Sequence, residues 1–163
     1  MSGGARRGLW LAWLLVLGLI PLLSVQGRTL RRLVYESIGR QGLAWLFLGV
    51  SVALAVLLAR WLKGRPARAH GLLLAAAAAL FLVVPLLLPL VDERLHFLVF
   101  GAWGFLSMLL FPLPWALFSV VLVGGLDELL QWWLPDRVGD WRDVGFNVLA
   151  GLGGIVLAWP GRR

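Results

Sequence analysis

Residues 126–154, LDELLQWWLPDRVGDWRDVGFNVLAGLGG, begin inside one apolar run of the chain and end inside the next. Between these points lie polar side chains that the other long apolar runs almost entirely lack, among them Asp127, Glu128, Gln131, Arg137, Asp140, Arg142, Asp143 and Asn147. Carboxylates and amides are costly near hydrocarbon, so a polar group kept there usually serves a function. We therefore interpret the rest of the chain as the frame that holds this segment in a bilayer.

The composition of the chain indicates a membrane protein. Of its 163 residues, 61% are hydrophobic and 14% are charged, and the mean hydropathy is +0.89. Soluble domains are about half apolar and about a quarter charged. A soluble domain of this size cannot bury so much apolar surface in one core. In a bilayer the same surface can face lipid tails.

Basic residues dominate the charge. The net charge of +7 comes from 15 Lys and Arg against 8 Asp and Glu, and the basic residues cluster between the apolar runs. This distribution is typical of loops that contact anionic headgroups. Nucleic-acid binding requires a folded basic face, and no soluble domain is left to carry one. The absence of Cys excludes disulfides, thiolate metal sites and thiol catalysis.

The apolar runs predict the fold. A transmembrane helix takes about 20 residues, and the candidate runs cover residues 9–25, 42–62, 72–91, 95–111, 115–134 and 144–159. The first run lacks a clean cleavage site, so we expect a retained helix rather than a signal peptide. The prediction is an all-α fold, a polytopic membrane helix bundle with about six transmembrane helices.

Two features of the N-terminal part leave alternatives open. Residues 26–41 carry apolar residues at helical spacing among arginines, which fits a short interfacial helix and an ordinary charged loop equally well. Basic residues are almost equally numerous on the two sides of the bundle, so the positive-inside rule does not fix the orientation. Arg6 and Arg7 favour a cytoplasmic N-terminus, which places the polar residues of 126–154 on the outer face.

Alternation of the spans brings the polar residues to one membrane face. The turn at 92–94 and the loop at 135–143 share that face. At a rise of about 1.5 Å per residue, Glu128 lies roughly 9 Å below the end of its run. We therefore predict that one interface gathers Asp92, His96, Glu128, Gln131, Arg137, Asp140, Asp143 and Asn147.

Helical spacing places these groups on shared faces. Asn147, Gly151 and Gly154 are related by i, i+4 and i+7, a stripe of small groups that permits close helix approach. A matching stripe on the fourth span holds His96, Phe100 and Trp103. If these stripes face the inside of the bundle, they line a pocket with His96, Glu128, Gln131 and Asn147. Arg137, Asp140 and Asp143 then lie above this pocket, nearer the membrane surface.

Several of these residues also have a purely structural interpretation. Gln131 and Asn147 suit a bridge between helices, a role worth about 0.6 kcal/mol in membranes. Asp92 suits a cap on the fourth span. Arg137 suits an exposed ion pair with a carboxylate of its own loop, and such pairs contribute about 1 kcal/mol or less.

Glu128 and His96 are harder to explain in this way. A carboxylate at that depth needs a partner or a proton, and His96 is an available partner. A proton shared by the two suits acid–base chemistry, and it suits a static hydrogen bond equally well. The neighbouring Asp127, by contrast, is expected to extend toward the headgroups.

The polar residues also match a motif of a known family. The order Asp92-x-x-x-His96, then Glu128-x-x-Gln131-x-x-x-Pro135-x-Arg137-x-x-Asp140-x-x-Asp143-x-x-x-Asn147, resembles the VanZ-like family of small bacterial membrane proteins. The resemblance covers about residues 80–158, and its second motif is long, gapped and specific. Glu93 stands where members commonly carry Lys, and Ala150 stands where they commonly carry Gly.

The resemblance implies a compartment and a context. It implies a multi-pass protein of the bacterial cytoplasmic membrane and a role in the cell envelope, because the family is named for a member linked to low-level resistance to the glycopeptide antibiotic teicoplanin. It implies no particular reaction. It divides the chain into a VanZ-like domain of four membrane helices, residues 71–160, and an N-terminal two-helix extension with basic loops, residues 1–70.

Functions of two classes follow. In the first, which we favour, the pocket engages a lipid or lipid-linked headgroup and alters the access of a lipophilic glycopeptide to the surface. In the second, an intramembrane enzyme acts on an envelope lipid with Glu128 or Asp143 as base and His96 as its partner. A purely structural role and a transporter are weaker alternatives. No metal site and no cofactor is predicted, because the sequence holds no His/Glu pair at i, i+4 and no phosphate-binding glycine loop.

Overall fold

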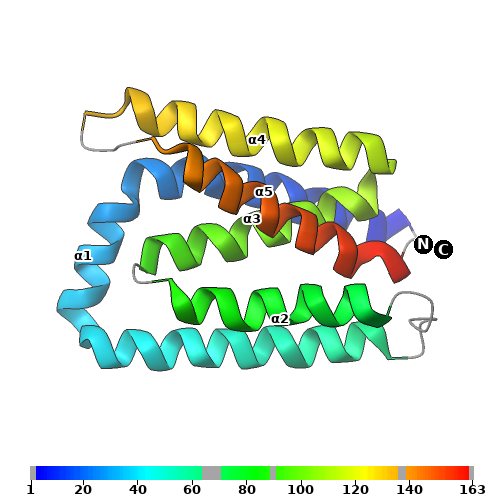
Figure 1. Cartoon of the computed structure of the whole chain (residues 1–163), viewed down its shortest axis with the longest axis horizontal. Coiled ribbons are helices and arrows are strands. Elements are labelled where there is room, and N and C mark those ends of the chain that lie inside the picture. The colour runs from blue at the N-terminus through cyan, green and yellow to red at the C-terminus, as the bar shows by residue number, and fades with distance from the viewer. Residues whose placement is uncertain (1–2, 64–70, 89–90, 136–138, 162–163) are drawn as a thin grey trace.

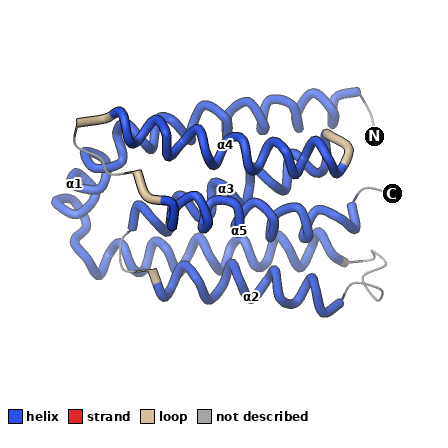
Figure 2. Tube along the Cα trace, turned by 45° about the horizontal axis from the view of Figure 1, so that its top comes forward, coloured by secondary structure: helices blue, strands red, loops and turns tan. Residues whose placement is uncertain are grey.

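The computed structural model of the protein describes residues 3–63, 71–88, 91–135 and 139–161, and every regular element in these residues is a helix. In chain order the elements are α1 (Gly3–Leu62), α2 (Gly71–Leu87), α3 (Val91–Leu110), α4 (Leu113–Trp133), α5 (Trp141–Ala158) and the short 3-10 helix η2 (Trp159–Gly161). The predicted all-α fold is confirmed, and its long helices lie roughly parallel in one bundle (Figure 1, Figure 2).

The first element contains two of the predicted helices joined by a kink. Gly39 has φ 65° and ψ −179°, outside the helical region. Glycine adopts a positive φ without the steric cost that a side chain imposes. The apolar parts of α1 before residue 26 and after Gly39 run in opposite directions along the bundle (Figure 1), and with α2 to α5 they account for every apolar run predicted from the sequence.

Residues 26–39, between the first two apolar runs, are helical, so the helical alternative for this region is confirmed. Figure 1 shows this part of α1, in light blue, turning across one end of the bundle. Arg28 and Arg32 are exposed on it, and Arg32 pairs with Glu36 one turn later at 2.9 Å. We call residues 26–39 the crossing segment. The polar end is the end of the bundle that it covers, where α3 and α5 begin and α4 ends.

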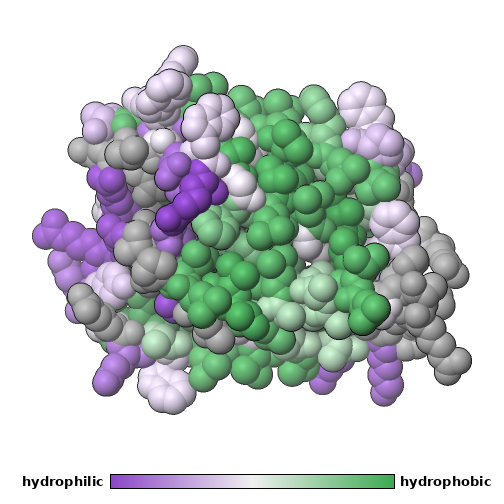
Figure 3. Space-filling view, viewed as in Figure 1, coloured by the Kyte–Doolittle hydropathy of each residue, from purple (hydrophilic) through white to green (hydrophobic). Residues whose placement is uncertain are grey.

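The surface of the bundle is that of a membrane protein. Four helices in the described residues are long and apolar enough to cross a membrane, namely Gly3–Gly39, Gln41–Arg60, Glu93–Leu110 and Leu113–Trp133. The shorter α2 and the more polar start of α5 lie in the same bundle (Figure 1). Apolar side chains cover the flank, and polar ones gather toward the ends (Figure 3). Leu72 is 90% exposed and Trp45 is 71% exposed, which suits lipid tails rather than water.

The closest helix contact lies between α3 and α5. A Cβ built on Gly104 of α3 would overlap the carbonyl oxygen of Gly151, and one built on Gly154 of α5 would overlap the carbonyl oxygen of Gly101. Backbones approach this closely only where side chains are absent. The predicted small-residue stripe on α5 is thus confirmed. It packs against Gly101 and Gly104 of α3, which the sequence analysis did not single out.

The first half of α1 shares the core of the bundle. Trp13 stacks on Trp103 of α3 with ring centroids 4.5 Å apart, and its Nε1 donates to Ser107 Oγ at 3.0 Å. Ile20 of the same half is buried in the core cluster that also holds Phe100 and Trp103. The division of the chain into residues 1–70 and 71–160 stays a prediction. The contacts of Trp13 and Ile20 with α3 join these two parts.

Candidate functional site

The last two turns of α4 carry three buried polar side chains. Asp127, Glu128 and Gln131 are each 6% exposed or less. Residues at i, i+3 and i+4 share one side of a helix, so the Gln131 amide can reach both acids. Its Nε2 donates to Asp127 Oδ2 at 3.0 Å and to Glu128 Oε1 at 3.3 Å. The two N–H groups of one amide therefore hydrogen-bond two neighbouring carboxyl groups.

Glu128 connects α4 to the start of α5. Asn147 Nδ2 donates to Glu128 Oε1 at 3.4 Å, and the backbone N–H of Asp140 donates to Glu128 Oε2 at 3.2 Å. Asp140 is the N-cap of α5, and its carboxylate accepts from the backbone N–H of Arg142 at 2.9 Å. The Glu128 carboxyl group thus lies at the positive end of the α5 dipole, which favours negative charge there.

Asp127 connects α4 to α1 and α3. The single hydroxyl proton of Ser24 has two acceptors within reach, Asp127 Oδ1 and the Ile20 carbonyl oxygen of its own helix at 3.1 Å. The Nε2 atom of His96 lies 3.6 Å from Asp127 Oδ2 and 3.5 Å from Ser24 Oγ. The Asp127 side chain has no exposed surface, whereas that of His96 keeps 12% exposed. We call Ser24, His96, Asp127, Glu128, Gln131 and Asn147 the polar cluster.

A second group of charges lies nearer the surface of the polar end. Arg142 approaches Glu93 of α3 at 3.6 Å and Asp143 at 3.9 Å, with 62% of its side chain exposed. Its guanidinium also lies over the Phe146 ring at 5.5 Å. Exposed pairs of this kind contribute about 1 kcal/mol or less. Asp143 belongs to this more exposed group of charges, with 37% of its side chain exposed.

The structure brings together most of the predicted site residues that it describes. Glu128, Gln131 and Asn147 are hydrogen-bonded to one another, and Asp140 joins them through its backbone. His96 joins through Asp127, whereas the sequence analysis expected Glu128 as its partner. Arg137 and the side chain of Asp92 lie outside the described residues.

The sequence analysis did not predict that Asp127 and Ser24 belong to the polar cluster. The expectation that Asp127 extends toward the headgroups is wrong, because its side chain is fully buried. Its i, i+4 relation to Gln131 was the signal that favoured an inward position. Ser24 gave no comparable signal, because a lone hydroxyl near the end of an apolar run says nothing about which helix it faces.

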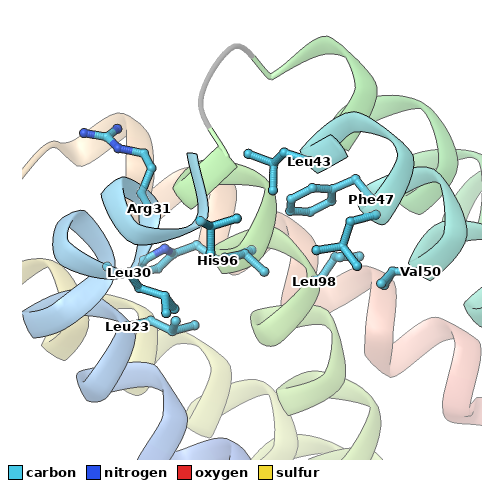
Figure 4. Close-up of a pocket in the computed structure, with 12 residues that line it drawn as sticks. Leu23, Leu30, Arg31, Leu43, Phe47, Val50, His96 and Leu98 are labelled. Atoms are coloured by element: carbon cyan, nitrogen blue, oxygen red, sulfur yellow. The ribbon is translucent and has the colours of Figure 1, made fainter. Parts of the chain in front are cut away.

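His96 also lines a partly open cavity of about 230 Å³ beside the polar cluster, between the bend of α1 and α3 (Figure 4). The Nε2 atom of this histidine contacts the Asp127 carboxylate and the Ser24 hydroxyl, and 12% of its side chain stays exposed. Among the described residues, no group of three or more His, Asp or Glu side chains is placed to hold a metal ion. The arrangement suits recognition of a polar group or proton transfer to one.

Comparison with known proteins gives one match. A family model described as VanZ/LLP1 matches residues 9–161, nearly the whole chain, and so includes both halves of α1. No curated protein and no solved structure matches the chain.

Proposed function

This chain belongs to the VanZ/LLP1 family, and we propose that its polar cluster engages the headgroup of a lipid or lipid-linked molecule of the bacterial cell envelope. In this proposal the protein is a multi-pass protein of the cytoplasmic membrane. By occupying or displacing such headgroups it alters the access of teicoplanin to the surface, and with it the susceptibility of the cell to this antibiotic.

One observation carries the proposal: the polar cluster reaches a cavity wall at His96. A network that only holds helices together needs no such access, because its hydrogen bonds are complete among the helices. Here Asp127 and Ser24 are fully enclosed, and the histidine that they contact keeps part of its ring open. Buried polar networks in membranes are expensive, so a network that ends at an accessible titratable group supports a ligand-binding role.

The depth of the cluster supports a headgroup as the ligand. The cluster lies at the polar end, under the crossing segment with its exposed Arg28 and Arg32. Arginines of this kind attract anionic lipid at the membrane surface. A ligand that meets both the arginines and His96 must therefore lie at the boundary between headgroups and acyl chains.

Headgroup preference in nanodiscs tests the proposal. Purified full-length protein is titrated with anionic, zwitterionic and lipid-linked headgroups, and the wild type is expected to discriminate among them. In Glu128→Gln an amide meets the donors of Asn147 and Asp140, so the cluster rearranges and discrimination is expected to fall. Arg6→Gln, at the opposite end of the bundle, is the control and should bind as the wild type does. If the wild type binds all three kinds of headgroup equally well, the proposal is wrong.

A second candidate function is an acid–base enzyme acting on an envelope lipid. The contact of Ser24, His96 and Asp127 favours it, because these residue types form catalytic triads. In a triad, however, the serine and the carboxylate contact different nitrogens of the histidine, whereas here both lie near Nε2. The binding function is therefore better supported. Turnover of a bound lipid by the wild type, lost in His96→Gln with binding intact, would establish the enzyme instead.

A further inference from the structure

The cavity beside His96 has walls of two kinds. Most of its lining is apolar and comes from three segments, the crossing segment with the turn before it, the second half of α1, and α3. Leu30 and Val34 represent the first, Phe47 the second and Leu98 the third. Among the described residues, its polar lining consists of Arg31 and His96, and no described Asp or Glu side chain lines it.

These two polar residues lie on one side of the cavity. Figure 4 shows His96 and Arg31 near Leu23 and Leu30, whereas Phe47, Val50 and Leu98 lie across from them. The guanidinium of Arg31 points away from the apolar side, out of the cavity. The cavity therefore has an apolar interior and a cationic edge, which is the complement of an amphiphile with an anionic head.

The volume suits part of a hydrocarbon chain. A cavity of about 150 Å³ lined by Leu, Ile and Phe binds benzene, and this one measures about 230 Å³. Because the cavity lies at the polar end, a chain that enters it stays joined to a headgroup at the level of the crossing segment. An isolated small molecule would gain the apolar contacts without using the cationic edge.

The charge of the crossing segment favours an anionic head. Within residues 26–39 there are three arginines, Arg28, Arg31 and Arg32, and one acid, Glu36, so the segment has a net positive charge. The guanidinium of Arg31 has the fork geometry that binds phosphate oxygens in pairs. The ammonium group of a zwitterionic head, by contrast, meets no carboxylate among the described residues that line the cavity, and Asp127 behind His96 is fully buried.

We propose that this cavity holds an acyl chain of an anionic phospholipid of the surrounding bilayer, with its phosphate between Arg31 and His96. The inference rests on the proposed function and adds to it the class of ligand and the anchor for its chain. The polar cluster then has a positioning role, because Asp127 and Ser24 contact His96 and orient its ring toward the phosphate.

Thermal unfolding with defined lipids tests this inference. Full-length protein in detergent receives phosphatidylglycerol or phosphatidylcholine with identical acyl chains, and Tm is followed against lipid concentration. A ligand that binds the folded state raises Tm in proportion to its affinity, so phosphatidylglycerol is expected to raise the wild-type Tm more. Arg31→Gln should weaken the apparent affinity for phosphatidylglycerol about tenfold, as loss of a charge-assisted hydrogen bond implies. Arg6→Gln, its matched control, should leave the affinity unchanged.

Two substitutions that fill the cavity complete the test. Leu98→Trp and Val34→Phe should each remove most of the Tm difference between the two lipids, while Leu122→Trp on the lipid-facing side of α4 should keep it. Two fillers are used so that one remains informative if the other does not fold. If a folded filler keeps the full preference for phosphatidylglycerol, the cavity is not the chain site and the inference is overturned.

The outcome also separates this inference from the proposed function. If Glu128→Gln loses headgroup discrimination while folded fillers and Arg31→Gln behave as the wild type, the proposed function stands and the cavity inference falls. Both fall if the wild type responds equally to every headgroup tested. Loss of the preference in the fillers and in Arg31→Gln, with both controls unchanged, supports both.

Discussion

Substitution of alanine for glycine at the α3–α5 contact tests the packing of the core most directly. In an exposed helical position this change is stabilising by about 0.5–1 kcal/mol, because alanine loses less conformational entropy than glycine on folding. At Gly104 and Gly154 the added Cβ instead overlaps backbone atoms of the facing helix. Backbone cannot move aside as a flexible side chain can, so the two helices must separate.

The magnitude follows from these two effects. Overpacking a close contact typically costs about 1–3 kcal/mol, which outweighs the propensity gain. Gly104→Ala and Gly154→Ala are therefore each expected to destabilise the fold by about 1–3 kcal/mol. Gly125→Ala and Gly145→Ala are the matched controls, since a Cβ at either position meets no atom within 4 Å. They are expected to be neutral or stabilising by up to about 1 kcal/mol.

The assay is unfolding of purified protein in detergent, by temperature or by increasing denaturing detergent, with all variants measured in one lipid and detergent mixture. For a chain of this size about 1 kcal/mol corresponds to roughly 2–4 °C in Tm, so the contact variants should unfold several degrees below the controls. Equal stability of Gly104→Ala and Gly125→Ala would refute the close α3–α5 contact, and with it the geometry that brings Asn147 to Glu128.

Three further substitutions probe other contacts by the same unfolding measurement. Ser24→Ala leaves the buried Asp127 without one of its donors and should lower the free energy of unfolding by about 1–3 kcal/mol. Ser37→Ala, at an exposed serine, should change stability little. Equal effects of the two substitutions would argue against the buried contact of Ser24 with Asp127. Trp13→Phe removes the donor to Ser107 and should cost about 1 kcal/mol, with Trp45→Phe at the lipid-facing surface as its control. Gly39→Ala places a side chain at φ 65° and should cost about 1–2 kcal/mol, and an unchanged Tm would show that the kink does not depend on that conformation.

The sequence predicted the helices and the main polar contacts because both follow from local patterns. Apolar length fixes where a helix can span lipid, and the i, i+3 and i+4 relations around Glu128 place Gln131 on its side of α4. The stripe of Asn147, Gly151 and Gly154 marks the packed face of α5 in the same way. These are the parts of the site that one helix determines by itself.

The contacts that the sequence did not predict depend on how helices rotate about their own axes. In water an apolar face shows which side of a helix is buried, but in lipid both sides are apolar and the pattern loses that information. Ser24 lies in such a helix, so nothing in its neighbours indicated that it faces Asp127. Gly101 and Gly104 were overlooked for a related reason, since the adjacent aromatic residues of α3 form the more conspicuous stripe.

The two acids of α4 differ in when their partners are synthesised. Ser24 and His96 precede Asp127 in the chain, so this acid has its hydrogen-bond partners as soon as α4 enters the membrane. Glu128 waits for Asn147, which lies 19 residues later and leaves the ribosome about one to four seconds afterwards at about 5–20 residues per second. During that interval Glu128 lacks its hydrogen bonds to α5, whereas Gln131 of its own helix is already present. Docking of α5 therefore supplies the two donors, Asn147 Nδ2 and the backbone N–H of Asp140, that Glu128 lacks until the last helix is made.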